Sequence, residues 1–135
     1  IFKKYSQIEE LTTITTQLCE SVNNECKLPV VICDRDHCIA CAGISRREVN
    51  ERRLTPYAEE IMEHRKIYTS EKDAKPLYAL EGVDRALQVL APIMSNGDIH
   101  GAIMLLDSGE NITHTESDLK LISAVAAFLG KQMEE

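Results

Sequence analysis

The most restrictive feature of the sequence is Asn96–Gly97, which stands between two apolar runs, 85–95 and 98–107. Both residues tolerate the positive φ of a type I′ turn, so the dipeptide is the strongest short-range signal for a β-hairpin. Pairing across this turn places Pro92 opposite Gly101. Proline lacks an amide donor and glycine lacks a side chain, so a small ligand or another backbone could approach there.

A second, shorter hairpin is predicted between residues 29 and 43. The apolar runs 29–33 and 38–42 flank a polar turn at Arg35–Asp36, as is typical of paired strands. The segment 66–69 has the composition of a further strand. Together these segments predict an antiparallel sheet.

Three of the five cysteines lie in this second hairpin. Their C-x4-C-x2-C spacing suggests an iron–sulfur, zinc or dithiol site. Strand alternation argues against a metal, because it places Cys33 opposite Cys38 on one face with Ala40, and Cys41 on the other face. No cysteine after Cys41 could complete a cluster. We therefore expect no metal and no cofactor, with Cys41 in the core and Cys33 and Cys38 able to form a disulfide under oxidation.

Helices are expected at both ends of the chain. Ser6 and Glu9 have the spacing of a capping box for a first helix at 6–23, and the last helix is expected to start near Thr113 or Thr115. Apolar residues recur along both helices at three-four spacing. Either these stripes only cover the sheet, or a two-fold axis joins two such pairs of helices into a four-helix interface of a homodimer, which is the expected arrangement. The expected interface residues are Ile8, Leu11, Ile14, Leu18, Leu119, Ile122, Ala126, Leu129 and Met133.

The last helix carries a second apolar set beside the first, namely Leu121, Val125 and Phe128. Its apolar arc is therefore wider than one sheet face would cover, which leaves a stripe for a partner chain. We expect charged residues in place of Ile122 and Leu129 to give a folded monomer.

A short helix is expected in the centre of the chain. Thr55–Pro56 joins a hydroxyl cap to a proline at the first helical position. The segment 45–53 before it is charged, with too few apolar residues for a buried element, and 70–79 after it is expected to be a polar connector. The residues of the short helix expected to face inward are Tyr57, Ile61 and Met62.

Composition limits the partners of the chain. Its 135 residues, 44% hydrophobic and 27% charged, have the size and balance of one globular domain. A net charge of −7 repels phosphate backbones, so we expect no direct contact with nucleic acid. No apolar run approaches the length of a membrane span, and an odd number of cysteines suits a reducing cytoplasm.

Motifs of catalysis are absent from the sequence. We find no G-x-S-x-G, H-E-x-x-H, P-loop or G-x-G-x-x-G pattern, and no nucleophile stands beside His100 or His114 in a recognisable arrangement. Neighbouring acids such as Glu59–Glu60 are typical of a solvated helix face. The chain is therefore not expected to be an enzyme.

The runs VVICDRDHCIACAG and LQVLAPIMSNGDIHGAIMLL, with a helix at each end, resemble a GAF domain. More narrowly, KKYS, LPVVICDRD, API-x-x-NGD-x-x-GA and FLGKQME are similar to the C-terminal regulatory region of the stage V sporulation protein T-like transcription regulators. The resemblance implies an α/β (α+β) fold, in which an antiparallel sheet carries the end helices on one face. A small-molecule pocket lies under loops and a short helix on the other face.

The resemblance also implies an organisation and a function. Residues 1–5 would be the remnant of a strand from a missing N-terminal DNA-binding domain, and 6–135 would be the sensor and oligomerisation domain. DNA would be bound only through the missing domain, and the sensor domains would form dimers and tetramers. The signature of cyclic-nucleotide-binding relatives is absent. By position, the candidate ligand-binding residues are Tyr57, Ile61, Tyr78, Arg85 and Val89.

The leading hypothesis is thus a non-catalytic sensor and oligomerisation domain of a sporulation transcription factor in the cytoplasm. The alternative is a thiol-based redox sensor, or a small-molecule reductase such as a methionine sulfoxide reductase, on the same fold. That chemistry requires a reactive cysteine and a resolving partner, and Cys33 and Cys38 are the only plausible pair.

Overall fold

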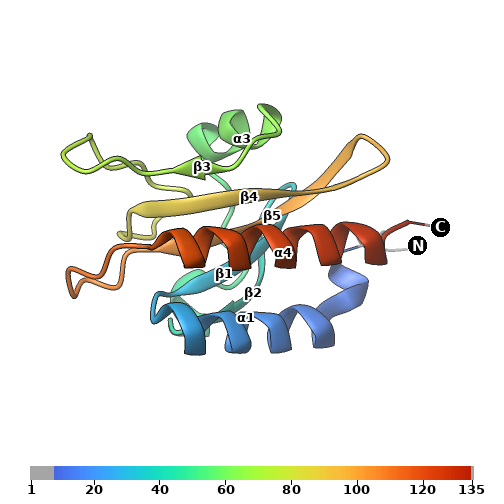
Figure 1. Cartoon of the computed structure of the whole chain (residues 1–135), viewed down its shortest axis with the longest axis horizontal. Helices are drawn as coiled ribbons and strands as arrows, with labels where there is room; N and C mark the ends of the chain where they lie inside the picture. The colour runs from blue at the N-terminus through green and yellow to red at the C-terminus, as the bar shows by residue number, and fades with distance from the viewer. Residues whose placement is uncertain (1–7, 135) are drawn as a thin grey trace.

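The computed structural model describes residues 8–134, which form a five-stranded antiparallel sheet with helices on both faces (Figure 1). The strands follow the order β2-β1-β5-β4-β3 across the sheet. The expected α+β architecture is confirmed. The expected strand remnant at 1–5 and the Ser6 cap lie outside the described residues. The strands are β1 (Val30–Asp34), β2 (Cys38–Ala42), β3 (Tyr68–Thr69), β4 (Leu87–Ser95) and β5 (Asp98–Leu106).

The two long helices lie side by side on one face of the sheet, and the short helices cover the other (Figure 1). Among the described residues, no helix combines the length and the apolar character needed to span a bilayer. The helical elements are the 3-10 turn η1 (Glu9–Leu11), α1 (Thr12–Cys26), α2 (Arg46–Val49), α3 (Pro56–Glu63) and α4 (Glu116–Gln132).

Local capping fixes where α3 and α4 begin. The Thr55 hydroxyl accepts a hydrogen bond from the Ala58 amide at 3.2 Å, and Pro56 occupies the first helical position. At α4, the Thr115 hydroxyl accepts from the Asp118 amide, while the Asp118 carboxylate accepts from the Thr115 amide at 2.9 Å. Each such cap contributes about 1 kcal/mol. Both predicted starts are confirmed.

The sheet separates two apolar cores. The helix-side core packs α1 and α4 against one face of the sheet, and includes Val30, Ile32, Val89 and Ile103. The opposite core joins α2, α3 and the segment 79–83 to the other face. Its members include Val49 of the charged segment 45–53, which is fully buried, so the expectation that this segment holds no buried element is wrong.

The inward residues of α3 differ from the prediction. Met62 is buried as expected, and Ala58 is buried beside it. Ile61 is half-buried, whereas Tyr57 is 62% exposed. Ala58 and Met62, four residues apart, define the buried face of α3, and Tyr57 lies beside that face on the solvent side.

Most of the expected interface stripe instead forms the core of its own chain. Ile122 and Leu129 are fully buried against the sheet, so the structure leads us to expect that a charge at either position disrupts folding instead of giving a folded monomer. The sheet covers the stripe of α4 that the sequence predicts to meet a partner chain. The stripe residues buried in this core are Ile8, Ile122, Ala126, Leu129 and Met133, and the half-buried ones are Leu11, Ile14, Leu18 and Leu119.

The Asn96–Gly97 hairpin forms as predicted, but its register shifts by one residue. A bulge opposite the step from Ile93 to Met94 makes His100 the extra residue of β5, so Gly101 pairs with Ile93, and Pro92 pairs with Ala102. The close backbone approach expected at Gly101 is present, because a Cβ there would collide with the Cys33 carbonyl oxygen of β1.

A bulge also changes the first hairpin. Cys33 pairs with Cys38 as predicted, but Ile32 pairs with Ala40, which leaves Ile39 as the extra residue. The strand alternation therefore reverses after Ile39. Ala40 packs on the helix side, and Cys41 packs in the opposite core with Cys33 and Cys38, so the predicted split of the three thiols over two faces is wrong.

Candidate functional site

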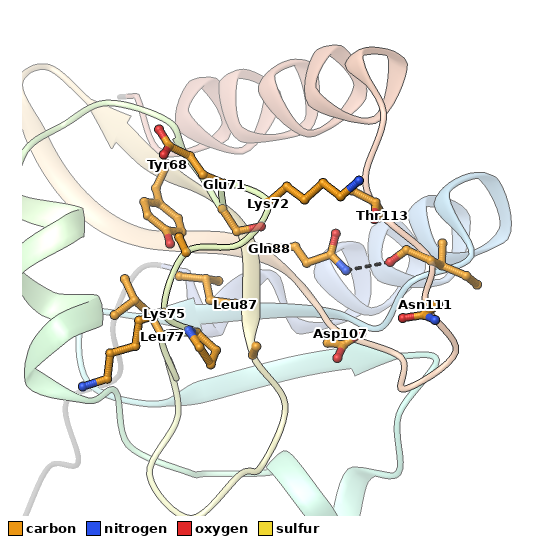
Figure 2. Close-up of a pocket in the computed structure, with 15 residues that line it drawn as sticks. Tyr68, Glu71, Lys72, Lys75, Leu77, Leu87, Gln88, Asp107, Asn111 and Thr113 are labelled. Carbon is orange, nitrogen blue, oxygen red and sulfur yellow. Dashed lines mark hydrogen bonds between the residues drawn. The ribbon is translucent and has the colours of Figure 1, made fainter.

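A cavity of about 360 Å³ lies at one end of the sheet (Figure 2). One wall is the connector 70–77 between β3 and β4, and the other is the loop 107–113 between β5 and α4. Ala86 and the first two residues of β4, Leu87 and Gln88, form the floor. Its volume falls in the range of small-molecule sites. The face under α3, where the family resemblance placed the pocket, is filled by apolar side chains.

Gln88 in the floor of the cavity occupies a β-bulge. Leu87 pairs with Leu106, and the next pair is Val89 with Leu105, so Gln88 is the extra residue of β4. A bulge locally re-aims a side chain and is frequent beside functional sites. Gln88 is only 8% exposed, although its side chain is polar.

Gln88 binds both walls of the cavity. Its backbone carbonyl accepts a hydrogen bond from the Ser70 amide at 2.8 Å. Its side-chain amide donates to the Ile112 carbonyl at 2.8 Å (dashed in Figure 2), and its side-chain oxygen accepts from the His114 amide at 2.9 Å. Since an unpaired buried polar group costs about 1–3 kcal/mol, these bonds hold the loop wall in place. His114 directly precedes Thr115, the cap of α4.

The cavity lining offers charges of both signs next to apolar surface. Its charged residues are Glu71, Lys72, Lys75 and Asp107, and Figure 2 shows the Lys72 side chain extending toward the loop wall. Burial, followed by the charge of Glu71, raises the pKa of Tyr68, which therefore stays a neutral phenol at neutral pH. The apolar part of the lining comes from Ala74, Pro76, Leu77, Ala86, Leu87 and Ile112. Such a lining can hold a small molecule that has both ionic and apolar parts.

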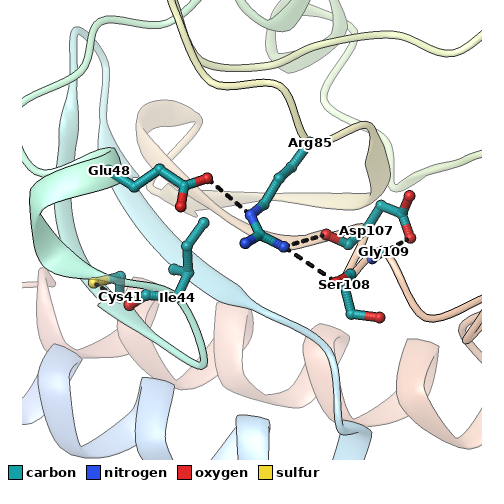
Figure 3. Close-up of polar contacts among 7 residues, drawn as sticks. All are labelled: Cys41, Ile44, Glu48, Arg85, Asp107, Ser108 and Gly109. Carbon is teal, nitrogen blue, oxygen red and sulfur yellow. Dashed lines mark hydrogen bonds and ion pairs between the residues drawn. The ribbon is translucent and has the colours of Figure 1, made fainter.

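Arg85 supports the loop wall from outside the cavity (Figure 3). Its Nε donates to Oε2 of Glu48 at 2.9 Å, which ties it to α2. Its Nη1 donates to the carbonyl oxygens of Asp107 and Ser108, each at 3.3 Å. The guanidinium is therefore engaged in positioning the start of the loop.

The structure does not gather the ligand-binding residues expected from sequence, because none of the five lines this cavity. Val89 is fully buried on the helix side, so its assignment to a pocket on the other face is wrong. Tyr57 and Tyr78 are exposed, and Tyr78 contributes its backbone carbonyl as acceptor for the Thr55 hydroxyl at 2.6 Å. Ile61 packs against the core on the α3 side.

Sequence reasoning missed the residues that do line the cavity. The sequence predicts only a polar connector at 70–79, and for Gln88 only a place in a strand. The sequence contains one indication of the cavity floor, because Gln88 is the only side-chain amide within the apolar run of β4. Its bulge was not readable from the sequence, because it depends on pairing with a distant strand.

The cysteine hairpin lies at the other edge of the sheet. Within residues 8–134, no three histidine, cysteine or acidic side chains gather in an arrangement that could hold a metal ion. The Cys38 thiol donates to the Ala40 carbonyl at 3.5 Å, and the Cys41 thiol to the Ile44 carbonyl at 3.8 Å (Figure 3).

Comparison with known proteins identifies relatives of the whole chain. A family model described as stage V sporulation protein T C-terminal, transcription factor, matches residues 10–134. Stage V sporulation protein T of Bacillus subtilis is 31% identical over 137 residues, which cover 100% of this chain and 75% of that protein.

Solved structures share the fold at low sequence identity. The GAF domain of Acinetobacter phosphoenolpyruvate-protein phosphotransferase is 13% identical with a TM-score of 0.69, over 96% of this chain and 82% of that one. The cofactor-binding GAF domain of the nutrient sensor CodY from Clostridium difficile is 9% identical with a TM-score of 0.59, over 94% and 93%. A type II free methionine-R-sulfoxide reductase from Thermoplasma acidophilum is 13% identical with a TM-score of 0.65, over 93% and 94%. These likenesses show a GAF fold and do not extend to function.

Proposed function

Because the chain belongs to the stage V sporulation protein T C-terminal family, which is a family of transcription factor domains, we propose that it is a non-catalytic domain that senses a small molecule. The regulatory role follows from the family. Sensing is supported by one observation above all, the cavity whose floor residue, Gln88, is bonded to both walls.

The proposed ligand is a small metabolite that carries charged or polar groups on an apolar body. Lys72 can pair with an acidic group, and Asp107 with a basic one. Leu77 and Leu87 offer apolar surface to the remainder. In a partly closed cavity, these contacts fix the orientation of a ligand as well as its affinity.

Occupancy of the cavity would act through the loop wall. The loop 107–114 ends at the Thr115 cap, so a ligand that contacts Asn111 or Thr113 acts on the segment that positions α4. A ligand shifts an equilibrium only by its differential affinity for two states. In this proposal the two states are two positions of the loop, which Gln88 and Arg85 hold in the unliganded arrangement.

A thermal-shift panel tests the sensing function. Amino acids, nucleosides and organic acids are added in turn to wild type, to Ala86→Trp, which fills the cavity floor, and to Glu81→Trp, which adds the same ring at an exposed turn. We expect at least one compound to raise the melting temperature of wild type and of Glu81→Trp, and to leave Ala86→Trp unchanged. Equal shifts in all three proteins, or no shift in any, would refute the proposal.

A second proposed function is assembly into homodimers, and further into tetramers, through the outer face of α1 and α4. Phe128 is 44% exposed, and Ala124, one turn before it, is exposed on the same side of α4, while Leu121 is half-buried against the helix-side core. On α1, Ile14 and Leu18 are half-buried at the same kind of spacing. DNA contact would come from another domain, as the charge of −7 suggests.

Sedimentation velocity tests assembly. Wild type is expected at twice the 15.2-kDa chain mass or a multiple of it, and Phe128→Glu at the monomer mass with an unchanged circular dichroism spectrum. Glu116→Lys, a charge change in the exposed first turn of the same helix, serves as the control and should remain assembled. A monomeric wild type, or a Phe128→Glu protein that still assembles, would contradict this interface.

A further inference from the structure

The tip of the first hairpin brings two thiols into direct opposition. Cys33 and Cys38 are paired across β1 and β2. The backbone amide of Cys38 donates to the Arg52 carbonyl at 2.9 Å, and its carbonyl accepts from the Glu51 amide at 3.2 Å. The backbone bonds of Cys38 therefore point away from Cys33, so the two residues form a non-hydrogen-bonded pair.

That pairing has the geometry of a disulfide. In a non-hydrogen-bonded antiparallel pair, the Cα atoms lie about 4.5 Å apart and the side chains are at their closest. A disulfide requires Cα atoms about 4.4–6.8 Å apart. Cys33 and Cys38 are free thiols in this structure, and they could be joined without a change in strand register.

Access from solvent is unequal for the two thiols. A cleft of about 110 Å³ between α1, β2 and α2 is lined by Cys38 and Cys41, with Arg46 at its side, and Cys33 is not part of the lining. A water molecule takes about 30 Å³, so the cleft has room for a hydroperoxide. Cys41 is half-buried, Cys38 is 1% exposed and Cys33 is fully buried, so an oxidant in the cleft reaches Cys41 and Cys38 before Cys33.

The thiols also differ in acidity. Cys33 and Cys38 are hydrogen-bonded, and a thiolate at Cys38 accepts the Cys33 proton donor, so this bond lowers the pKa of Cys38 and raises that of Cys33. Burial raises the pKa of Cys41 in spite of the nearby Arg46. Since the thiolate is the nucleophile, Cys38 is the reactive member of the three.

We propose that Cys38 is an oxidation site for hydroperoxides and that Cys33 is its resolving partner. The Cys38 thiolate attacks one peroxide oxygen, the O–O bond breaks, and the products are a Cys38 sulfenic acid and hydroxide or an alkoxide. The Cys33 sulfur then attacks the Cys38 sulfur. The S–O bond breaks, and the departing oxygen leaves as water with the Cys33 proton. Two thiols are oxidised to one disulfide, and the peroxide is reduced.

This site is separate from the proposed ligand cavity. The cysteine pair lies on β1 and β2, at one edge of the sheet, and the cavity lies beside β3 and β4, at the other. Failure of one proposal therefore leaves the other standing.

Peptide mapping tests the oxidation site directly, because trypsin cleaves after Arg35, between the two cysteines. Reduced native protein is treated with a small excess of hydrogen peroxide, unfolded in an alkylating agent, digested and analysed by mass spectrometry. We expect peptides 28–35 and 36–46 to be covalently linked, and the link to be lost on reduction. A bond within peptide 36–46, oxygen added to Cys41 alone, or five thiols that remain fully alkylated would each overturn the proposal.

Variants assign the roles within the pair. Cys41→Ser should form the linked peptides to the same extent as wild type, and Cys38→Ser should lose the link completely. Cys33→Ser should stop at the sulfenic acid, which dimedone traps on Cys38. A link that persists in Cys38→Ser, or disappears in Cys41→Ser, would assign the reaction to Cys41 and contradict the proposal.

Discussion

Gly130 shows how a single missing Cβ sets the distance between α4 and the sheet. A Cβ at this buried position would collide with the backbone carbonyl oxygen of Met94 in β4. Backbone cannot move aside as a flexible side chain can. The glycine therefore allows the last turns of α4 to lie directly on β4.

Replacement of Gly130 by alanine should lower the free energy of unfolding, although alanine has the higher helix propensity. Propensity alone predicts a gain of about 1 kcal/mol for Gly→Ala inside a helix. We expect a net loss of about 1–3 kcal/mol instead, since overpacking forces the helix away from the strand. Urea unfolding followed by circular dichroism measures the difference. Ala127→Gly, at an exposed position of α4 outside the proposed interface, isolates propensity, with an expected loss of about 1 kcal/mol. A Gly130→Ala protein as stable as wild type would refute the close contact.

Cys26 at the end of α1 predicts how stability depends on alkaline pH. Burial, and then a hydrogen bond with Asp118, raise the pKa of the Cys26 thiol from 9.0 to about 12. Between these values the unfolded thiol has lost its proton and the folded thiol has kept it. The unfolded state then binds fewer protons, so the free energy of unfolding falls as pH rises from about 9 to about 12.

The test is urea unfolding at a series of pH values. Wild type should lose stability above pH 9.0, and Cys26→Ala should lose less over the same interval, starting from a lower baseline. Cys19, Cys41 and Tyr68, whose pKa values burial also raises, would contribute to the remaining slope. If the free energy of unfolding falls equally with pH in the two proteins, the fold does not raise the pKa of the Cys26 thiol.

At the scale of elements, the two faces of α4 should respond oppositely to charge. Ile122 is fully buried in the helix-side core, and Phe128 is 44% exposed. Burial of an unpaired carboxylate costs several kcal/mol, so Ile122→Asp should unfold the domain or leave it barely stable. Phe128→Asp should melt within a few degrees of wild type. A cooperative melt for Ile122→Asp near the wild-type temperature would contradict the assigned orientation of the helix.

The elements also show what the sequence could predict. Asn96–Gly97, Thr55–Pro56 and the cap at Thr115 act within a few residues, and each predicted element lies where its local chemistry puts it. The bulges at Gln88 and Ile39 follow from pairing between strands. One extra residue reverses every later side chain, which is why strand alternation assigned Cys41 to the wrong face.

Contacts between residues distant in sequence also decide which helix face is buried and where the cavity lies, so the sequence predicted neither. Periodicity identified apolar stripes on both long helices, but it carries no information on which stripe faces the sheet and which faces solvent. The ligand cavity depends on two loops, 70–77 and 107–113, that are distant in sequence and lie on opposite sides of β4. Their approach is visible only once Gln88 is seen to bond with both.

At the scale of the whole molecule, function is divided between regions of one sheet. The outer face of α1 and α4 is proposed to hold copies together, and the cavity beside β3 and β4 to hold a ligand. Gln88 and the loop 107–114 join that cavity to the start of α4. In this proposal, ligand binding therefore affects assembly through one loop, 107–114.

Native mass spectrometry of the chain tests the central claim, that the cavity holds a small molecule, most directly. Spectra are recorded on the protein as purified and after incubation with the same panel of metabolites. We predict ions of wild type, and of Glu81→Trp, that carry one small molecule per chain, and ions of Ala86→Trp that carry none. Wild-type ions that are bare under every condition, or adducts that Ala86→Trp retains in full, would contradict the account.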